Sequence, residues 1–210
     1  MQRGPFIVLE GIDGSGTTTQ RAALQARLQQ SGWRVHATAE PTEGPIGGLI
    51  RDALTGARDL AEDTLALLFA ADRIQHVNTT IAPRLRDGEL VLCDRYLLSS
   101  LAYQSVQLPL PWVLEINAQA LRPDLTVLLD VGPEVAADRR RHRGSAPERF
   151  DALERQRAVA ENYQRLVQRS DIGQVRIVDA NGPAAAVREA LATTVCNWLQ
   201  SEYVHPQETP

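Results

Sequence analysis

The residues best suited to chemistry follow the first apolar run of the sequence, Phe6-Ile7-Val8-Leu9. They are Gly11-Ile12-Asp13-Gly14-Ser15-Gly16-Thr17-Thr18-Thr19, which come directly after Glu10 at the end of this run. Gly11, four residues, Gly16 and a hydroxyl at Thr18 match the phosphate-binding frame Gly-x4-Gly-Lys-Ser/Thr everywhere except at the lysine. Glycines let a backbone turn N–H groups inward around a phosphate, and a following helix adds its positive N-terminal end. We expect residues 11–19 to bind the phosphates of ATP, although a glycine-rich turn without a ligand is the alternative.

Thr17 occupies the position of the lysine that reaches the β- and γ-phosphates in this frame. Threonine is short and uncharged, so the missing charge must come from elsewhere or be absent. All 22 basic residues of the chain are arginine, and no lysine is present. We interpret Thr17 as part of this chain-wide absence of lysine rather than as a selective loss of activity.

A second candidate site follows the apolar run Leu90-Val91-Leu92-Cys93, where Asp94-Arg95-Tyr96 begins. Ligands of open α/β sheets bind beyond the carboxyl ends of the strands. An aspartate there can hold Mg²⁺ directly or through water, together with the Thr18 hydroxyl. The alternative is a surface ion pair between Asp94 and Arg95, which would contribute little.

A run of arginines, Asp138-Arg139-Arg140-Arg141-His142-Arg143, precedes a loop that contains Gly144 and Pro147. Arg139 and Arg143 are one helical turn apart and project in the same direction. Phosphoryl transfer depends on positioning and on neutralisation by cations. We interpret residues of about 138–151 as a short lid over the phosphates of ATP; a solvated basic face or an RNA-contacting patch is the alternative.

Five short apolar runs alternate with segments of helical period, and this order predicts the elements that position these residues. The runs span residues 6–9, 34–38, 90–93, 125–129 and 175–178. Apolar stripes between and after them predict helices, as in Ile46, Leu49, Ile50, Ala53 and Leu54, in Leu24 and Leu28, in Val77, Ile81 and Leu85, and in Val187, Leu191, Val195 and Trp198. Alternating strands and helices imply a largely parallel sheet between helical layers. We expect one three-layer α/β domain over residues 1–203 and a flexible polar tail over residues 204–210.

Composition excludes several classes of protein. A net charge of −4 argues against a sequence-independent nucleic-acid binder, and no apolar run approaches the roughly 20 residues of a membrane span. No signal peptide is visible, and Cys93 and Cys196 lack redox or metal-ligand spacing, which favours a reducing cytoplasm. The four histidines, His36, His76, His142 and His205, share no metal-ligand spacing.

Five motifs that occur in order together resemble the thymidylate kinase family over roughly residues 5 to 200. They are Glu10–Gly14, Glu40-Pro41-Thr42, Phe69–Arg73, Asp94–Gln104 and Arg122–Leu125. The resemblance implies a P-loop NTPase fold with a five-stranded parallel sheet. It also implies Mg²⁺-assisted transfer of a phosphate from ATP to dTMP for dTTP synthesis, and a homodimer formed by helix packing.

The resemblance also assigns roles at the acceptor nucleotide. Phe69 would stack on the thymine and Arg73 would donate to it, although without the resemblance a core Phe and a solvated Arg would be favoured. Arg95 matches the arginine that clamps the 5′-phosphate, and Tyr103 matches the tyrosine that crowds the sugar 2′ position. The remaining acceptor residues are Asp13 near the sugar and a metal-bound water, Glu40 toward the acceptor or Mg²⁺, and Ser99, Ser100 and Gln104 as hydrogen-bond partners of the nucleoside.

The family divides according to whether a catalytic arginine lies in the phosphate loop or in the lid. Gly14 leaves this loop without one, and Arg139 and Arg143 match the lid version. The catalytic set is therefore Asp13, Arg95, Arg139 and Arg143, and we hypothesise that the lid arginines supply part of the charge that Thr17 cannot. Asp179-Ala180-Asn181 resembles the loop beside the adenine. Ala39 stands where many relatives have arginine before Glu-Pro, so that contact is lost.

Two other functions remain open on the sequence alone. The chain could be a kinase for another nucleoside monophosphate. It could also be a nucleotide-binding pseudokinase that lost its chemistry together with the lysine. An intact acceptor site and lid weigh against the pseudokinase.

Overall fold

The computed structural model describes residues 3–144 and 149–203. Residues 145–148 of the predicted lid, the predicted tail of residues 204–210 and His205 lie outside the described residues. Within the described ranges, every helix is too short or too polar to cross a membrane.

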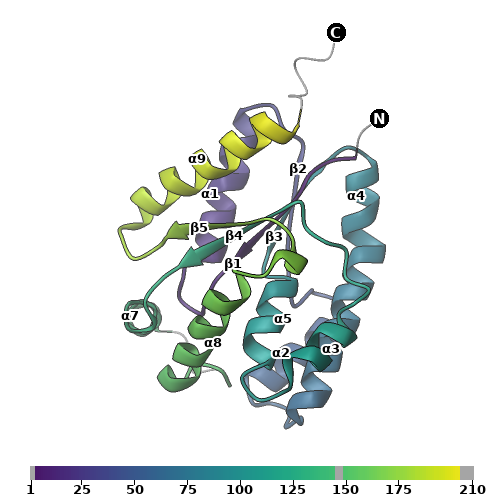
Figure 1. The fold of residues 1–210 in the computed structure, drawn as a ribbon, viewed down its shortest axis with the longest axis vertical. Coiled ribbons are helices and arrows are strands. Elements are labelled where there is room, and N and C mark those ends of the chain that lie inside the picture. Colours follow the sequence, from purple (N-terminus) through teal and green to yellow (C-terminus); the bar gives the residue numbers. More distant parts are fainter. Residues whose placement is uncertain (1–2, 145–148, 204–210) are drawn as a thin grey trace.

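A five-stranded parallel sheet forms the centre of the molecule (Figure 1). Its strands are β1 (Phe6–Glu10), β2 (Val35–Ala39), β3 (Leu90–Asp94), β4 (Leu125–Asp130) and β5 (Val175–Asp179). The strand order is β2-β3-β1-β4-β5, so β1 is the central strand and lies between β3 and β4. All five residues of β1 are buried. All five predicted strands and the parallel α/β architecture are confirmed.

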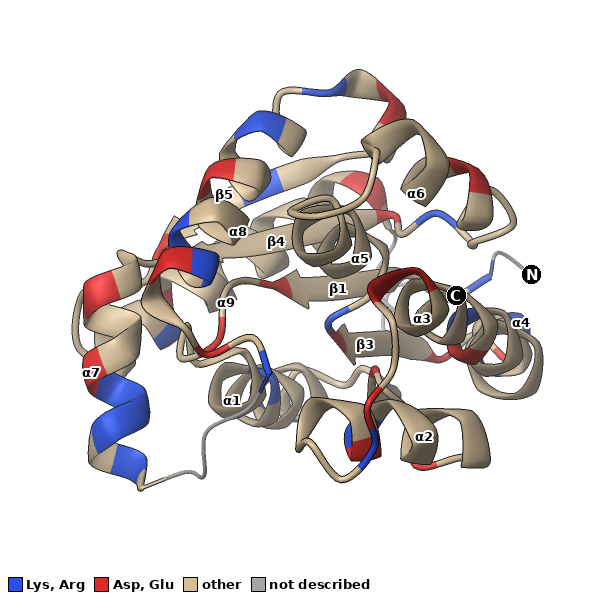
Figure 2. Ribbon diagram, turned by 90° about the horizontal axis from the view of Figure 1, so that it is seen from below, with Lys and Arg blue, Asp and Glu red and all other residues tan. Residues whose placement is uncertain are grey.

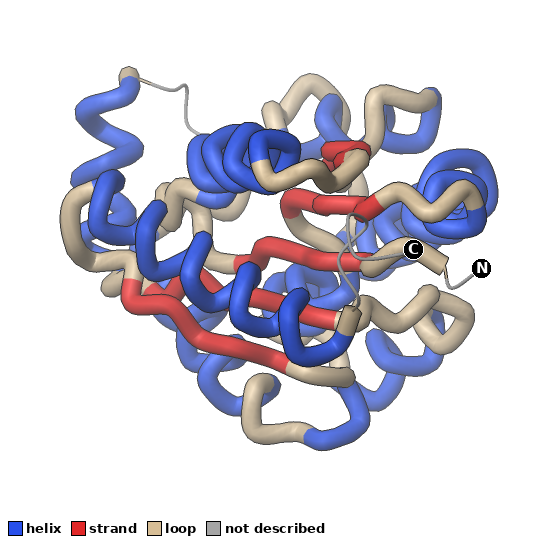
Figure 3. The backbone as a smooth tube through the Cα atoms, turned by 90° about the horizontal axis from the view of Figure 1, so that it is seen from above, coloured by secondary structure: helices blue, strands red, loops and turns tan. Residues whose placement is uncertain are grey.

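Helices cover both faces of this sheet, which gives the predicted three layers (Figures 1 and 3). One face carries α1 (Thr17–Gln30) and α9 (Ala184–Glu202), which pack on each other. The opposite face carries α5 (Leu97–Gln104) and α8 (Leu153–Leu166), which also pack together. The other helical segments are α2 (Pro45–Leu54), α3 (Glu62–His76), the π-helix η1 (Val77–Ile81), α4 (Ala82–Arg86), α6 (Leu110–Ile116), α7 (Pro133–Arg143) and the 3₁₀ turn η2 (Ser170–Ile172).

Two predicted helical stripes differ from the structure in detail. Leu49 belongs to the apolar stripe of α2 but remains 38% exposed. The stripe of Val77, Ile81 and Leu85 does not lie on one α-helix, because the π-helix η1 separates α3 from α4. A π-helical turn holds more residues than an α-helical turn, so it changes which side chains share a face. The stripes of α1 and α9 are buried as predicted.

The register of the strands brings the predicted chemistry to one edge of the sheet. Leu9 pairs with Asp94, and Glu10 pairs with Leu128, so the carboxyl ends of β1, β3 and β4 lie side by side. The glycine-rich loop leaves β1 and the Asp94-Arg95-Tyr96 segment leaves β3 at this edge. Neighbouring parallel strands therefore bring together two motifs that are about 80 residues apart in sequence.

Gly47 in α2 has no room for a side chain, and this gives a prediction about stability. A Cβ at Gly47 would lie 1.8 Å from the carbonyl oxygen of Thr42, whereas one at Gly48 would meet nothing within 4 Å. We expect Gly47→Ala to lower the free energy of unfolding by about 1–3 kcal/mol through overpacking. Gly48→Ala, the matched control in the same helix, should raise it by up to about 1 kcal/mol through helix propensity. Urea unfolding of both variants tests this, and equal effects would contradict it.

Candidate functional site

The glycine-rich loop between β1 and α1 has the geometry of a phosphate cradle. Gly14 and Gly16 both have a φ of 94°, in the left-handed region that favours glycine. Gly14 also passes close to α7, since a Cβ there would lie 2.4 Å from the carbonyl oxygen of Ala136. Gly16 caps α1, so the free N–H groups of the first turn of that helix begin at Thr17.

A cavity of about 290 Å³, here called the loop cavity, lies over this cradle. Of the nine predicted phosphate-binding residues, six line it: Asp13, Gly14, Gly16, Thr17, Thr18 and Thr19. Ser15 lines a neighbouring cavity of about 310 Å³, the outer cavity, whereas Gly11 and Ile12 line neither. The Ile12 side chain belongs to the hydrophobic core, so only its backbone could take part.

Thr18 and Asp94 meet at the floor of the site. The Thr18 hydroxyl donates to Asp94 Oδ2 at 2.6 Å, while Asp94 Oδ1 is buried and has no hydrogen-bond partner. A hydroxyl and a carboxylate with an unused oxygen fit Mg²⁺, which prefers oxygen ligands. In the described part of the chain no three His, Cys, Asp or Glu side chains are grouped to hold a metal, so phosphate oxygens and water would complete such a site.

Arg95 lies where the loop cavity meets a second cavity. In the described ranges it alone among non-glycine residues has a positive φ, 66°, and residues held in sparsely populated conformations cluster at functional sites. Its Nη2 lies 2.7 Å from Asp13 Oδ1, and its Nη1 donates to Ser99 Oγ at 3.3 Å. The guanidinium carbon lies 5.2 Å from the centre of the Tyr103 ring. These contacts direct the planar fork of Arg95 along the walls of both cavities.

The second cavity, here called the inner cavity, has a volume of about 260 Å³. It extends from Asp13, Thr18 and Arg95, which also line the loop cavity, to the side chains between α3 and α5. All the predicted acceptor residues line it: Asp13, Glu40, Phe69, Arg73, Arg95, Ser99, Ser100, Tyr103 and Gln104. Phe150, from the far end of the predicted lid, also lines it and packs against the Tyr103 ring.

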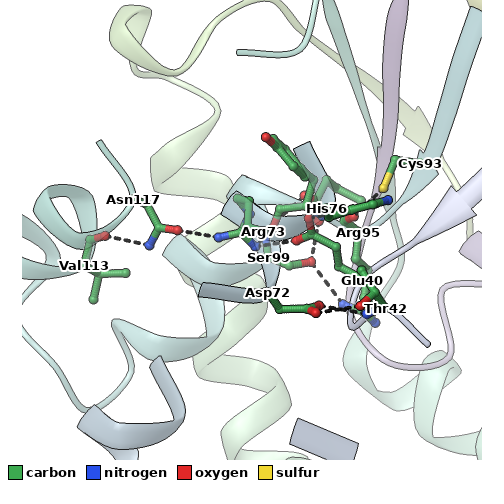
Figure 4. Close-up of polar contacts among 12 residues, drawn as sticks. Glu40, Thr42, Asp72, Arg73, His76, Cys93, Arg95, Ser99, Val113 and Asn117 are labelled. Carbon is green, nitrogen blue, oxygen red and sulfur yellow. Dashed lines mark hydrogen bonds and ion pairs between the residues drawn. The ribbon is translucent and has the colours of Figure 1, made fainter. Parts of the chain in front are cut away.

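Arg73 is buried and fully ordered by partners, so the alternative of a solvated arginine is wrong. Its Nη2 donates to Glu40 Oε2 and to the Tyr96 carbonyl, both at 2.8 Å, and its Nη1 donates to Asn117 (Figure 4). Only 1% of its side chain is exposed. The Nε of Arg73 is buried without a partner, so its N–H is available to a ligand.

Glu40 uses both carboxylate oxygens inside the protein. One binds Arg73, and the other lies 3.1 Å from His76 Nδ1, whose Nε2 lies 2.7 Å from the Thr38 hydroxyl. Glu40 therefore lines the inner cavity while it orients Arg73 and His76. Neither His76 nor Asn117 could be selected from the sequence, because their partners are far away along the chain.

Ser100 and Gln104 present free polar atoms on one face of α5. Ser100 Oγ and Gln104 Oε1 are buried, line the inner cavity and have no hydrogen-bond partner. Buried polar atoms are rarely left unpaired, so these two point to a polar ligand in the inner cavity. Ser99 differs from them, because its hydroxyl donates to Glu10 Oε2 at 2.5 Å.

Glu10 is a buried carboxyl at the end of β1 that the sequence did not identify as a site residue. It accepts hydrogen bonds from the backbone N–H groups of Tyr96 and Ser99, at 3.0 and 3.1 Å, and so holds the start of α5. The Tyr163 hydroxyl donates to it at 3.0 Å. Burial raises the pKa of the Glu10 carboxyl above its ordinary value in spite of these donors. An acidic residue that ends an apolar strand was the available signal.

The arginine run forms the last turns of α7 (Figure 2), and its members have different partners. Arg139 donates to the carbonyls of Asn181 and Gly182, at 3.2 and 2.9 Å, and lines the outer cavity. Arg143 is exposed and lines both the outer and the loop cavities. Arg140, which the sequence placed only beside them, donates to the Asp13 carbonyl and lines the loop cavity.

Comparison with known proteins indicates the same family that the sequence motifs resemble. A family model described as thymidylate kinase matches residues 9–191. The probable thymidylate kinase of Pyrococcus abyssi (strain GE5 / Orsay) is 44% identical over 200 residues, which cover 92% of this chain and 96% of that protein. The thymidylate kinase of Thermomicrobium roseum is 43% identical over 197 residues, 90% of this chain and 93% of its own. That of Staphylothermus marinus, named probable thymidylate kinase, is 44% identical over 179 residues, 85% and 87% of the two chains.

Proposed function

This chain belongs to the thymidylate kinase family, and from that premise we propose that it transfers the γ-phosphate of ATP to dTMP, forming dTDP and ADP for dTTP synthesis. The observation that carries the proposal is the junction of two cavities. Asp13, Thr18 and Arg95 line both the loop cavity and the inner cavity. Two nucleotides bound in these cavities would meet end to end at that junction.

The donor phosphates bind at the loop cavity. Inward N–H groups of the glycine-rich loop and the N-terminal end of α1 bind phosphate oxygens. Thr18 and Asp94 would hold Mg²⁺, which would neutralise phosphate charge. Arg139 and Arg143 close over ATP from α7, and the Asp179–Asn181 segment lies beside the adenine.

The acceptor nucleotide binds in the inner cavity. Phe69 stacks on the thymine, Arg73 donates to it, and the free atoms of Ser100 and Gln104 complete its polar contacts. Tyr103 lies against the sugar beside Asp13, and Arg95 binds the 5′-phosphate. The acceptor oxygen already belongs to a phosphate anion, so attack in line with the γ-phosphorus needs no strong general base. The protein contributes alignment and charge neutralisation.

A coupled assay for ADP release with dTMP and MgATP tests this function. We expect turnover that depends on dTMP and stops when Mg²⁺ is removed with EDTA. UMP and CMP at the same concentrations should give far lower turnover, because neither base carries the thymine methyl group and both sugars carry the 2′-hydroxyl that Tyr103 would crowd. Comparable rates with UMP or CMP would instead favour a kinase for another nucleoside monophosphate. ATP binding without turnover would favour the pseudokinase.

We also propose that the enzyme forms a homodimer and that it is located in the cytoplasm. Leu67 and Ile74 on α3 are 50% and 41% exposed, and Leu49 on α2 is 38% exposed, which leaves apolar side chains available for packing between copies. Cys93 and Cys196 are free thiols, as in proteins of reducing compartments. Sedimentation equilibrium would give the oligomeric state.

A further inference from the structure

Gln156 of α8 connects two segments that wall the cavities. Its side chain is fully buried. Its Oε1 accepts from the Asp13 backbone N–H at 3.1 Å, and its Nε2 donates to Asp13 Oδ2 and to the Phe150 carbonyl, both at 2.7 Å. One amide therefore uses its acceptor and both of its donors on partners 143 and 6 residues away in sequence.

Each of these partners controls a different part of the site. The second carboxylate oxygen of Asp13 binds Arg95 at 2.7 Å, so Gln156 fixes the face that Asp13 presents to Arg95. The Phe150 ring packs against the Tyr103 ring, with 5.7 Å between the two ring centres, and Phe150 lines the inner cavity. The next residue, Asp151, lies 3.1 Å from Arg140 Nε at the wall of the loop cavity.

The segment that Gln156 holds also closes the inner cavity toward α2. The Arg149 N–H donates to the Leu54 carbonyl at 2.9 Å. Arg149 and Arg155 both pair with Glu62 at the start of α3, at 3.3 and 3.1 Å. Leu54 and Phe150 line the same cavity. The residues that precede Gln156 thus connect α8 to the walls of the inner cavity.

We infer that Gln156 is a positioning residue for phosphoryl transfer. This role rests on the proposed function, and Gln156 lies outside the site residues assigned above. Gln156 holds Asp13 and Phe150 with one amide. Through Asp13 it orients Arg95 toward the acceptor phosphate. Through Phe150 it ties the wall of the inner cavity to the phosphate loop. A neutral amide suits this place, since a carboxylate would face the Asp13 carboxylate and an aliphatic chain would leave buried polar groups unpaired.

The first test compares Gln156→Leu with Gln174→Leu. Gln174 is the matched control, because its side chain also makes a defined hydrogen bond, accepting from the Trp198 indole at 2.8 Å, but lines none of the three cavities. We expect Gln156→Leu to lower kcat/KM for dTMP by about 10- to 100-fold, the range for hydrogen bonds to a charged group. Gln174→Leu should stay within about twofold of the parent, the spread typical of a surface change. Equal kinetics for the two variants would overturn the inference.

A double-mutant cycle separates positioning from a general loss of packing. If Gln156 acts through Asp13 on Arg95, its substitution should have much less effect on kcat/KM once Arg95→Met has removed the guanidinium. Fully additive effects of Gln156→Leu and Arg95→Met would mean that Gln156 does not act through Arg95, and would overturn the inference. Thermal unfolding of each variant verifies that the assays report folded protein.

Gln156→Glu provides a signature that a structural role would not produce. A protonated carboxyl at this position can still donate to Asp13 Oδ2 and accept from its N–H, whereas an ionised one is repelled by Asp13. The other charged groups around Asp13 are Arg95, Arg140 and Asp151. The parent also contains these groups, so their effect on the pH dependence cancels when the variant is divided by the parent. We therefore expect kcat/KM of Gln156→Glu, divided by that of the parent, to rise as pH falls from 8 to 6. A flat ratio would contradict the inference.

The parent enzyme distinguishes failure of this inference from failure of the proposed function. If the parent does not phosphorylate dTMP, the function itself is wrong. If the parent is active and the Gln156 variants match Gln174→Leu, the function stands and Gln156 has no positioning role. Binding of dTMP alone, measured by titration calorimetry, should also weaken in Gln156→Leu and not in Gln174→Leu.

Discussion

Replacing Arg95 by methionine is expected to reduce kcat/KM for dTMP by about 30- to 5,000-fold, which corresponds to the roughly 2–5 kcal/mol lost when one partner of a hydrogen-bonded charge pair is truncated. Methionine fills similar space but carries no charge, so the acceptor phosphate loses its clamp. The Asp13 carboxylate, 2.7 Å from Arg95, loses its ion-pair partner as well and keeps its hydrogen bond from Gln156. Both effects weaken the arrangement in which the two phosphates meet.

Two controls make the Arg95 experiment specific. Arg95→Lys keeps the positive charge but loses the planar fork, so its loss should be intermediate. Arg141→Met removes an exposed arginine that pairs with Asp138 and should leave turnover unchanged. Steady-state kinetics with dTMP varied at saturating MgATP gives each value. Retention of most activity in Arg95→Met, with unfolding temperature unchanged, would remove Arg95 from the catalytic set.

The second large effect concerns the charge that Thr17 does not supply. Thr17 is buried at the start of α1 and lines the loop cavity, where the arginines are Arg95, Arg140 and Arg143. If guanidinium groups replace the lysine, Arg143→Ala should lower kcat by about 10²- to 10³-fold, since a single arginine at the transferred phosphoryl group can contribute more than that. Unchanged turnover in Arg143→Ala would contradict this compensation.

A Thr17→Lys background tests whether the arginines supply the positive charge that the missing lysine would supply. Arg143→Ala should cost much less in that background, because the new charge reaches the same phosphates. Arg140→Met should behave in the same way, since Arg140 lies against the loop through its contact with Asp13. Lower activity in Thr17→Lys alone would show that the loop has adapted to threonine, and a large gain would show that the parent enzyme is impaired. Arg141→Ala serves as the control for the arginine run.

Part of the site could be predicted because its signals are local. The glycines at positions 14 and 16 indicated a backbone that turns sharply around a phosphate, and both have a φ of 94°. Phe69 and Arg73 are four residues apart, so a helix had to place them on one face, and both line the inner cavity. The neutral residue at position 17 and the arginine run were equally visible without a structure.

Strand and helix periodicity are properties of neighbouring residues, so the sequence alone predicted the five strands and the buried stripes of α1 and α9, although not the π-helix η1. The sequence did not determine which polar groups are buried together. Gln156 and Asp13 are 143 residues apart and Arg73 and Asn117 are 44 apart, and these pairs form because α8 lies against the phosphate loop and the end of α6 lies against α3. The tertiary structure therefore decided that Arg73 is buried, that Ser99 faces Glu10 rather than the cavity alone, and that Arg140 contacts the loop. A hydrogen bond depends on distances in space, and spacing along the chain fixes those distances only within one element.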